Sequence, residues 1–240
     1  MNMRANKMTA SILTYELKND VAHLHMDDGK ANALSHAMID ALNDAIDKAE
    51  SEAKAIMISG REKRFCAGFD LSVMSGGPAE VTRLVSRGAN LLTRLYGLKL
   101  PVIIACTGHA LAAGGLLLLA ADYRVGTKGD FRIGLNEVAI GMTTPMFLLD
   151  FARDRVPATW LPRATVHAHL FNPVEATSSG FLDEAVDAAD LLTRATSIAE
   201  QMGALPQPAF AASKKKLNRE TIERIEANLT ADSSTFDGAS

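Results

Sequence analysis

A single acidic residue, Glu137, lies in the apolar and glycine-punctuated stretch IGLNEVAIGM, residues 133–142. Burial raises the pKa of a carboxyl group and makes its anion a stronger base. The commoner alternative is an ion pair with an arginine such as Arg132 or Arg153, which would leave Glu137 with a structural role only. The stretch is therefore a candidate site of general-base chemistry, with the ion pair as the competing explanation.

Two further stretches are suited to present unpaired main-chain N–H groups. In RFCAGFD, residues 64–70, small residues after a predicted strand allow a sharp turn that leaves the next amides free. In GHALAAGGLLLLAAD, residues 108–122, a helix is predicted to begin near residue 113 and to leave its first N–H groups without partners. Donors from Phe69 and Ala113 would form an oxyanion hole if the fold brings the turns together. The alternative for the first stretch is a purely structural turn. The alternative for the second is a tight helix–strand contact that needs small residues.

The composition excludes several classes of partner. The chain has 240 residues, 48% hydrophobic residues and a formal net charge of -3, so no basic excess indicates nucleic acid or an anionic membrane. The two cysteines have no metal-ligand spacing, and we expect no metal. The first residues, MNMRANKMTA, lack an apolar signal core, which favours a cytoplasmic location.

The elements that must position these residues follow an alternating rhythm. Residues 11–26 alternate around a turn at 18–20 and predict a hairpin, and Ser35 is a predicted cap for a helix over 35–50. Buried strands are predicted at 53–60 and 101–108, and residues 75–80 are a candidate lid before a helix that ends at 97. Strands alternating with helices indicate an α/β fold with much parallel pairing. Beyond Pro145 we predict helices at 146–154, 158–169, 173–178 and 188–202, and a last one from about 206.

Taken together, four segments resemble the crotonase family, also called the enoyl-CoA hydratase/isomerase family. They are KANALSHAM at 30–38, RFCAGFDL at 64–71, PVIIACTGHALAAGG at 101–115 and IGLNEVAIG at 133–141, and the resemblance covers nearly the whole chain. It implies a crotonase-type spiral of ββα turns with an acyl-CoA site over residues 1–190. It also implies a C-terminal helical trimerisation region over 191–240, and hence a homotrimer or hexamer.

The resemblance also assigns the catalytic roles. The oxyanion donors fall on the N–H groups of Phe69 and Ala113, the second of which is usually a glycine in the family. Hydratases carry a glutamate three residues after that donor, where this chain has Leu116. Their second glutamate matches Glu137, set in LNE as in the Δ3,Δ2-enoyl-CoA isomerases. Hydration needs two such groups, whereas a 1,3-proton shift needs one base.

For the substrate, the resemblance implies an acyl-CoA thioester and no cofactor other than the CoA that the substrate itself carries. The implied contacts with substrate and CoA are Lys30, Ala31, Ala33, Cys66, Ala67, Gly68, Asp70, Leu116 and Asn136. Arg61, Lys63, Arg64 and the run SKKKLNR at 213–219 are candidate phosphate partners.

The predicted function is isomerisation of a 3-enoyl-CoA to a trans-2-enoyl-CoA in fatty acid metabolism. It proceeds through a dienolate held in the oxyanion hole, with Glu137 as the only base and residues 116–119 as a dry wall. Hydration or another acyl-CoA lyase or hydrolase reaction on the same scaffold is the alternative. A non-catalytic acyl-CoA-binding protein is the alternative from a different class.

Overall fold

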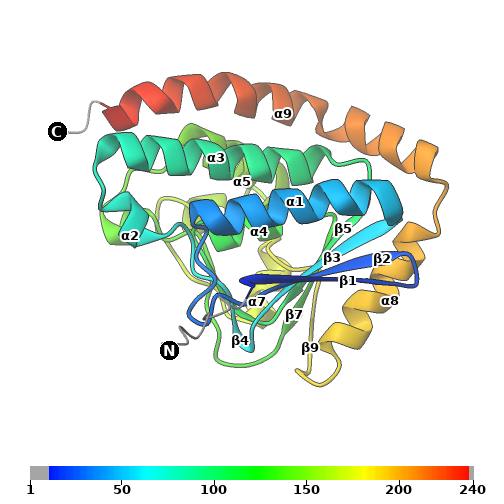
Figure 1. Ribbon diagram of the computed structural model, residues 1–240. Helices are drawn as coiled ribbons and strands as arrows, with labels where there is room; N and C mark the ends of the chain where they lie inside the picture. Colours follow the sequence, from blue (N-terminus) through cyan, green and yellow to red (C-terminus); the bar gives the residue numbers. More distant parts are fainter. Residues whose placement is uncertain (1–10, 238–240) are drawn as a thin grey trace, which may run out of the picture.

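The computed structural model describes residues 11–237, which form four strand–strand–helix units followed by further helices (Figure 1). The first three units are β1 (Leu13–Lys18), β2 (Val21–Met26) and α1 (His36–Glu52); β3 (Ala55–Gly60), β4 (Lys63–Cys66), α2 (Leu71–Met74) and α3 (Pro78–Gly97); and β5 (Val102–Cys106), β6 (Gly108–Leu111) and α4 (Ala113–Ala120). The fourth comprises β7 (Tyr123–Thr127), β8 (Ile133–Gly134), the 3-10 turn η1 (Val138–Ile140) and α5 (Met146–Arg155). There follow α6 (Leu161–Ala164), α7 (Pro173–Ser178), β9 (Glu184–Val186), α8 (Leu191–Gly203) and α9 (Gln207–Asp237).

The strands form two sheets. The larger has six strands in the order β1-β2-β3-β5-β7-β9, antiparallel between β1 and β2 and parallel elsewhere. The smaller has three parallel strands in the order β4-β6-β8. From the second unit on, the first strand of each unit joins the large sheet and the second joins the small one. The predicted spiral of ββα turns is therefore confirmed.

Two local predictions near the start of the chain are also confirmed. The β1–β2 hairpin turns at Asn19 and Asp20, whose φ angles of 50° and 62° suit a tight two-residue turn between right-twisted strands. Helix α1 begins after Ser35, whose side chain accepts a hydrogen bond from the N–H of Met38 at 3.2 Å.

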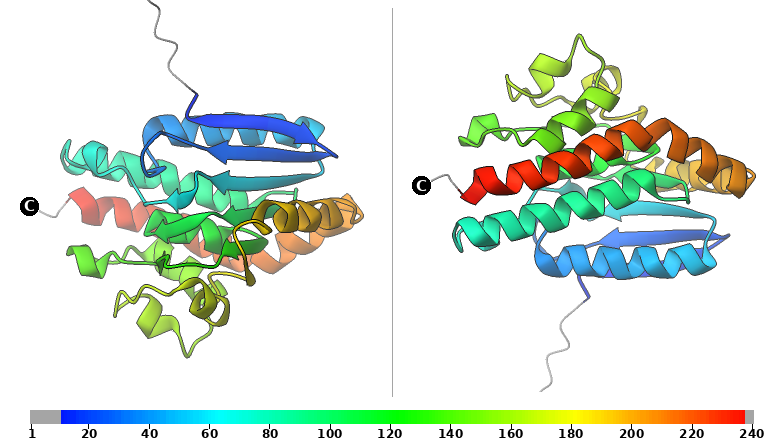
Figure 2. Two further views of the ribbon diagram at one scale, coloured as in Figure 1. Left: turned by 90° about the horizontal axis from the view of Figure 1, so that it is seen from below. Right: turned by 90° about the horizontal axis from the view of Figure 1, so that it is seen from above.

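The central strands of the large sheet, β3, β5 and β7, are buried on both faces. Met57, Ile103 and Val125 pack with α8 on one face, whereas Ile58 and Ile104 belong to the main core on the other. Figure 2 shows α8 crossing one face and the layer of α1, α3 and α9 beyond the other. Continuous apolar runs such as residues 102–106 follow from this two-sided burial.

Helix α9 is held on the core by polar contacts as well as apolar ones. It lies along α3 and α5 (Figure 2, right). The buried Lys214 ammonium donates to Asp122 Oδ2 at 2.5 Å and to the main-chain oxygens of Leu95 and Leu100 at 3.3 and 3.4 Å. The prediction that residues 213–219 bind phosphate is therefore wrong for Lys214, because its charge is already neutralised inside the fold.

One other element prediction is wrong, and one strand was not predicted. The predicted helix 158–169 is reduced to the four residues of α6, because Thr165 Oγ1 turns back to the carbonyl of Leu161 and Ala168 adopts a left-handed φ of 48°. Strand β9 has only three residues and no recognisable period, yet it completes the large sheet beside β7. Helix α8 packs on that same sheet, so the expected division of the chain at residue 190 stays a prediction.

None of the helices within residues 11–237 is long and apolar enough to cross a membrane.

Candidate active site

Each of the three sequence stretches singled out for chemistry begins in a strand of the small sheet and continues past the end of that strand. Strands β4, β6 and β8 end at residues 66, 111 and 134, and they are parallel, so the segments after them meet at one edge. The contact is close. A Cβ atom added to Gly68 would lie 2.9 Å from the Cβ of Ala112 and 3.6 Å from the nitrogen of Ala113. The fold thus brings the two predicted donor turns together.

The N–H of Phe69 is left free by the way its neighbours pair. Leu34 donates its N–H to the carbonyl of Gly68 at 2.8 Å and accepts the N–H of Asp70 at 3.2 Å. This is a parallel bridge between Leu34 and Phe69, in which the N–H of the middle residue points to the opposite side. Within residues 11–237 that N–H has no acceptor.

The second donor is the N–H of Ala113. Ala113 is the first residue of α4, so its N–H has no intrahelical partner. The preceding Ala112 has φ 50° and ψ -121°, a backbone conformation that side chains disfavour, while its own N–H donates to Gly134 at 3.0 Å. Such a conformation costs on the order of 1–3 kcal/mol and is concentrated at functional sites. It turns the chain from strand to helix within one residue and leaves the Ala113 amide without an acceptor in the part of the chain that the structure describes.

The glycine pair after Ala113 has a packing role. A Cβ on Gly114 would lie 2.2 Å from the carbonyl oxygen of Cys66, and one on Gly115 would lie 2.9 Å from that of Gly134. Helix α4 therefore begins in direct contact with the ends of β4 and β8. The tight helix–strand contact and the unpaired donor are both present, and the glycines serve the first.

Glu137 is only 8% exposed and has no ion-pair partner among the side chains of residues 11–229. Arg153 pairs instead with Asp150 at 3.7 Å, and no contact joins Arg132 to the Glu137 carboxyl, so the ion-pair explanation does not hold. Burial without a compensating charge raises the pKa of Glu137 from 4.5 to about 7. At neutral pH this carboxyl is poised to accept or to release a proton.

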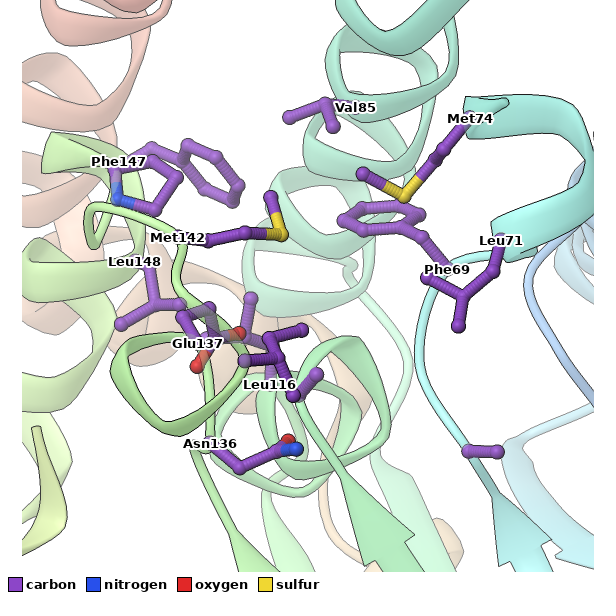
Figure 3. Close-up of a pocket in the computed structure, with 14 residues that line it drawn as sticks. Phe69, Leu71, Met74, Val85, Leu116, Asn136, Glu137, Met142, Phe147 and Leu148 are labelled. Carbon is purple, nitrogen blue, oxygen red and sulfur yellow. The ribbon is translucent and has the colours of Figure 1, made fainter. Parts of the chain in front are cut away.

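Glu137 lies in a pocket lined mainly by apolar side chains (Figure 3). Its lining residues are Ala67, Phe69, Leu71, Met74, Val85, Ala112, Leu116, Asn136, Glu137, Ile140, Met142, Pro145, Phe147 and Leu148. Only Asn136 and Glu137 contribute side chains with nitrogen or oxygen atoms, and the Asn136 Oδ1 is buried without a hydrogen-bond partner. The Glu137 carboxyl lies near Leu116 and Leu148, across the pocket from Phe69 (Figure 3).

The pocket contains part of the predicted site. Ala67, Phe69, Leu116, Asn136 and Glu137 line it, and no second carboxyl does. Of the leucine run at 116–119, only Leu116 reaches it, so the prediction of a four-leucine wall is wrong. The other three leucines are buried elsewhere in the core because their helix is enclosed on all sides.

The segment predicted to bind CoA lies beside the end of β4. The buried Asn32, at φ 53°, donates its side-chain amide to the carbonyls of Met26, Arg64 and Phe65 at 2.9, 3.2 and 3.3 Å. The carbonyl of Ala31 accepts the N–H of Ala67 at 3.1 Å. Asn32 was not among the predicted site residues, although an asparagine in a short loop is a signal for a left-handed backbone.

Two arginine side chains lie against this segment. Arg61 and Arg64 each donate to the carbonyl of Lys30, at 3.0 and 3.3 Å, which places their guanidinium groups beside the Lys30 backbone. The grouping fits the expectation of phosphate partners in a chain of mildly acidic net charge.

The remaining predicted contacts do not line the pocket. Cys66 is fully buried, and burial raises the pKa of its thiol to about 12, so only its main chain is available to a ligand. Asp70 caps α2 by accepting the Ser72 N–H at 2.9 Å, and its hydrogen bonds to Ser72 lower the pKa of its carboxyl. Ala33 accepts the N–H of Ser35 in the same loop. Binding of CoA by these residues, by Lys30 and by Gly68 stays a prediction.

The pocket-lining residues from the helices were missed by sequence reasoning. Met74, Val85, Phe147 and Leu148 were not assigned to the site, because an apolar residue on a helix carries no sign of which cavity it faces. No group of three or more His, Cys, Asp or Glu side chains suited to a metal ion occurs within the described part of the chain.

Comparison with known proteins places this chain in a family of enzymes that act on acyl-CoA thioesters. The sequence model described as "Enoyl-CoA hydratase/isomerase" matches residues 16–239, and the chain belongs to that family, the crotonases. It is 29% identical over 221 residues to the human "Enoyl-CoA delta isomerase 1, mitochondrial", covering 90% of this chain and 73% of the relative.

Other similar proteins carry different names. A "Probable enoyl-CoA hydratase" of Rhodobacter capsulatus is 30% identical over 244 residues, covering 94% of this chain and 88% of the relative. A crystal structure of a hydratase/isomerase family protein from Pseudomonas syringae superposes with a TM-score of 0.92 at 36% identity, covering 94% and 98% of the two chains. The crotonase fold is thereby confirmed, and the relatives bear the names of both reactions.

Proposed function

We propose that the protein is an acyl-CoA isomerase that converts a 3-enoyl-CoA to the trans-2-enoyl-CoA. The observation that carries this proposal is a pocket with one ionisable side chain, Glu137, and with Leu116 at the position where hydratases of the family have their first catalytic glutamate. One base suffices for a proton shift between two carbons, whereas hydration requires a group that activates water and a group that moves the proton.

In the proposed mechanism the thioester carbonyl oxygen accepts the N–H groups of Phe69 and Ala113. The ionised Glu137 carboxylate takes a proton from C2, and the electron pair of the broken C–H bond moves into a dienolate whose negative charge rests on the thioester oxygen. The two free amides stabilise that charge without having to reorient. The Glu137 carboxylic acid then gives the same proton to C4, which leaves the double bond between C2 and C3.

Two properties of Glu137 support this assignment. Its pKa, raised to about 7 by burial, matches a group that must take up and release a proton in one turnover. Its surroundings are apolar, with Leu116 beside it, so water has few hydrogen-bond partners near the reacting carbons. Both favour return of the proton over addition of water.

The decisive experiment supplies the purified protein separately with 3-enoyl-CoA and with 2-enoyl-CoA. We expect rapid isomerisation of the first and little 3-hydroxyacyl-CoA from the second. Glu137→Gln, which keeps the shape and removes the base, should lower kcat by a factor on the order of 10³. Glu220→Gln, at an exposed position on α9, is the matched control and should leave kcat unchanged.

Fast hydration with slow isomerisation would reject the proposal in favour of a hydratase. Acyl-CoA binding without exchange of the C2 proton in heavy water would instead indicate a protein that binds acyl-CoA and does not turn it over.

A further inference from the structure

Gly88 occupies the middle of helix α3, where a glycine costs about 1 kcal/mol relative to alanine. It is buried, and a Cβ atom added to it would lie 2.2 Å from Cε1 and 2.6 Å from Cζ of the Phe69 ring. The ring thus rests directly on the backbone of the helix. The missing side chain of Gly88 forms a notch for it.

The position of this ring determines the width of the pocket. Phe69 lines the pocket together with Met74 and Val85, and Met142 and Phe147 face them from the other side (Figure 3). Any shift of the ring away from α3 would bring it toward the opposite wall. The side chain of Phe69 is therefore the part of the wall that the Gly88 notch holds back.

The pocket is polar at one end only. Asn136 and Glu137 lie together near Leu116, whereas the walls beyond them are made of hydrocarbon and thioether groups (Figure 3). A hydroxyl or carboxyl group on the far part of a ligand would lose its water there without finding a partner, which is costly. Methionine side chains adapt to an unbranched chain better than branched ones do.

We propose that Gly88 is a specificity-determining residue, which by receiving the Phe69 ring keeps the pocket open for an unbranched, wholly apolar acyl chain. This rests on the proposed function in so far as the ligand is an acyl-CoA. A methyl group at residue 88 would have to separate from the ring to the ordinary contact distance of 3.4 Å or more. Because the helix is fixed in the core, the ring moves into the space of the acyl chain.

The test measures binding and needs no turnover. Isothermal calorimetry gives the affinity for saturated acyl-CoA thioesters of increasing length, starting from acetyl-CoA, for the wild-type protein and its variants. In the wild type the affinity should rise about fourfold per added CH₂ until the chain fills the pocket. In Gly88→Ala the rise should stop at a shorter chain, with the affinity for acetyl-CoA unchanged.

Two further variants separate the notch from a general effect on α3. The double variant Gly88→Ala/Phe69→Ala has no ring to displace, and it should bind chains at least as long as the wild type does. Gly97→Ala, at the end of the same helix and outside the pocket, meets only the flexible end of Ile222 at 3.1 Å and should bind as the wild type does.

The inference is overturned if the rise stops at the same chain length in Gly88→Ala as in the wild type, or if the double variant keeps the shorter limit. Should Gly88→Ala not fold, the double variant decides, since failure of both to fold would show that the notch does not serve the ring. If the wild type and its variants show the expected chain-length limits but the wild type has no isomerase activity, the proposed function is rejected and this inference stands.

Discussion

At the scale of the residue, the environment of Glu137 sets its chemistry. The carboxyl is enclosed by apolar groups, and no cation or second carboxyl contacts it among the side chains of residues 11–229. The loss of hydration is therefore what opposes the ionisation of Glu137. This free-energy cost lowers the stability of the folded protein whenever the carboxyl is ionised.

The first prediction concerns stability against pH. Below pH 4.5 the carboxyl holds its proton in both the folded and the unfolded chain, so Glu137 costs nothing; above pH 7 it is ionised in both, and the full cost is present. The difference between the two pKa values corresponds to about 3 kcal/mol. Glu137→Gln should accordingly raise the free energy of unfolding by about 2 kcal/mol more at pH 8 than at pH 5, as measured by urea denaturation.

The exposed Glu220→Gln serves as the control for this measurement and should show no such dependence. An equal effect of Glu137→Gln at the two pH values would mean that the pKa of Glu137 is not raised in the folded protein.

The second prediction concerns the place of Leu116. Leu116→Glu adds a second carboxyl beside the first, and we expect 3-hydroxyacyl-CoA to form from 2-enoyl-CoA while isomerisation slows. The variant should also lose a few kcal/mol of stability, because a second acid is buried. Leu116→Gln, similar in size and polarity but unable to take up a proton, should form no hydrated product in the same coupled assay. Equal hydration by both variants would contradict the assignment of position 116 as the place where the other acid of a hydratase is missing.

At the scale of the element, the site depends on how the small sheet ends. Each of its three strands delivers one irregular segment: the free Phe69 amide after β4, the strained Ala112 and free Ala113 amide after β6, and Glu137 after β8. Gly68 makes the first turn possible, because its φ of 101° is closed to most side chains and its Cα faces Ala112.

The third prediction is that Gly68→Ala lowers both stability and turnover. The backbone strain alone should cost about 1–3 kcal/mol, and the added Cβ, 2.9 Å from that of Ala112, should push the two donor turns apart and lower kcat. Gly77→Ala is a matched control, because its φ of 105° imposes a similar strain while nothing lies within 4 Å of the added Cβ. It should lose stability and keep the kcat of the wild type. If kcat falls equally in both, the spacing of the turns does not matter.

Some of these elements could be predicted from the sequence and others could not. The hairpin, the cap at Ser35 and the start of α4 near Ala113 were predictable, because each depends on a few adjacent residues with strong local preferences. The meeting of the three segments came from the family resemblance, since neither spacing nor period shows which strands pair. The notch at Gly88 and strand β9 were not predictable, because each exists only through a partner distant in sequence.

At the scale of the whole molecule, α9 is tied to the core at a buried ion pair. The side chains of Lys214 and Asp122 are 4% and 11% exposed, and the Asp122 carboxylate also accepts the N–H of Val102 at 2.8 Å. Removing one charge of such a pair leaves the other buried and unpaired, which destabilises the fold strongly, whereas replacing both charges destabilises it far less.

The fourth prediction follows. Lys214→Met should lower the free energy of unfolding by about 3–5 kcal/mol in urea denaturation, because the Asp122 carboxylate is left buried and unpaired. The double variant Lys214→Met/Asp122→Asn should recover most of that loss, since the asparagine oxygen still accepts the Val102 N–H. Additive losses in the double variant would show that the two charges are not coupled.

The fifth prediction is the state of assembly that the family resemblance implies. Light scattering on the purified protein should give a mass three or six times that of the 25.6-kDa chain. Leu217, 77% exposed on α9, is the residue to test, because this helix lies in the region expected to join the copies. Leu217→Asp should reduce the mass, and a monomeric wild type would contradict the prediction.

The sharing of one small sheet by both donors and the acid has a consequence for how the protein tolerates thermal motion. A displacement of that sheet carries all three groups with it, so the spacing on which proton transfer depends survives. Much of the hydrocarbon wall comes from α2, α3 and α5, which lie outside that sheet. Movement of these helices therefore changes the space for the acyl chain without changing the spacing of the two amides and the acid.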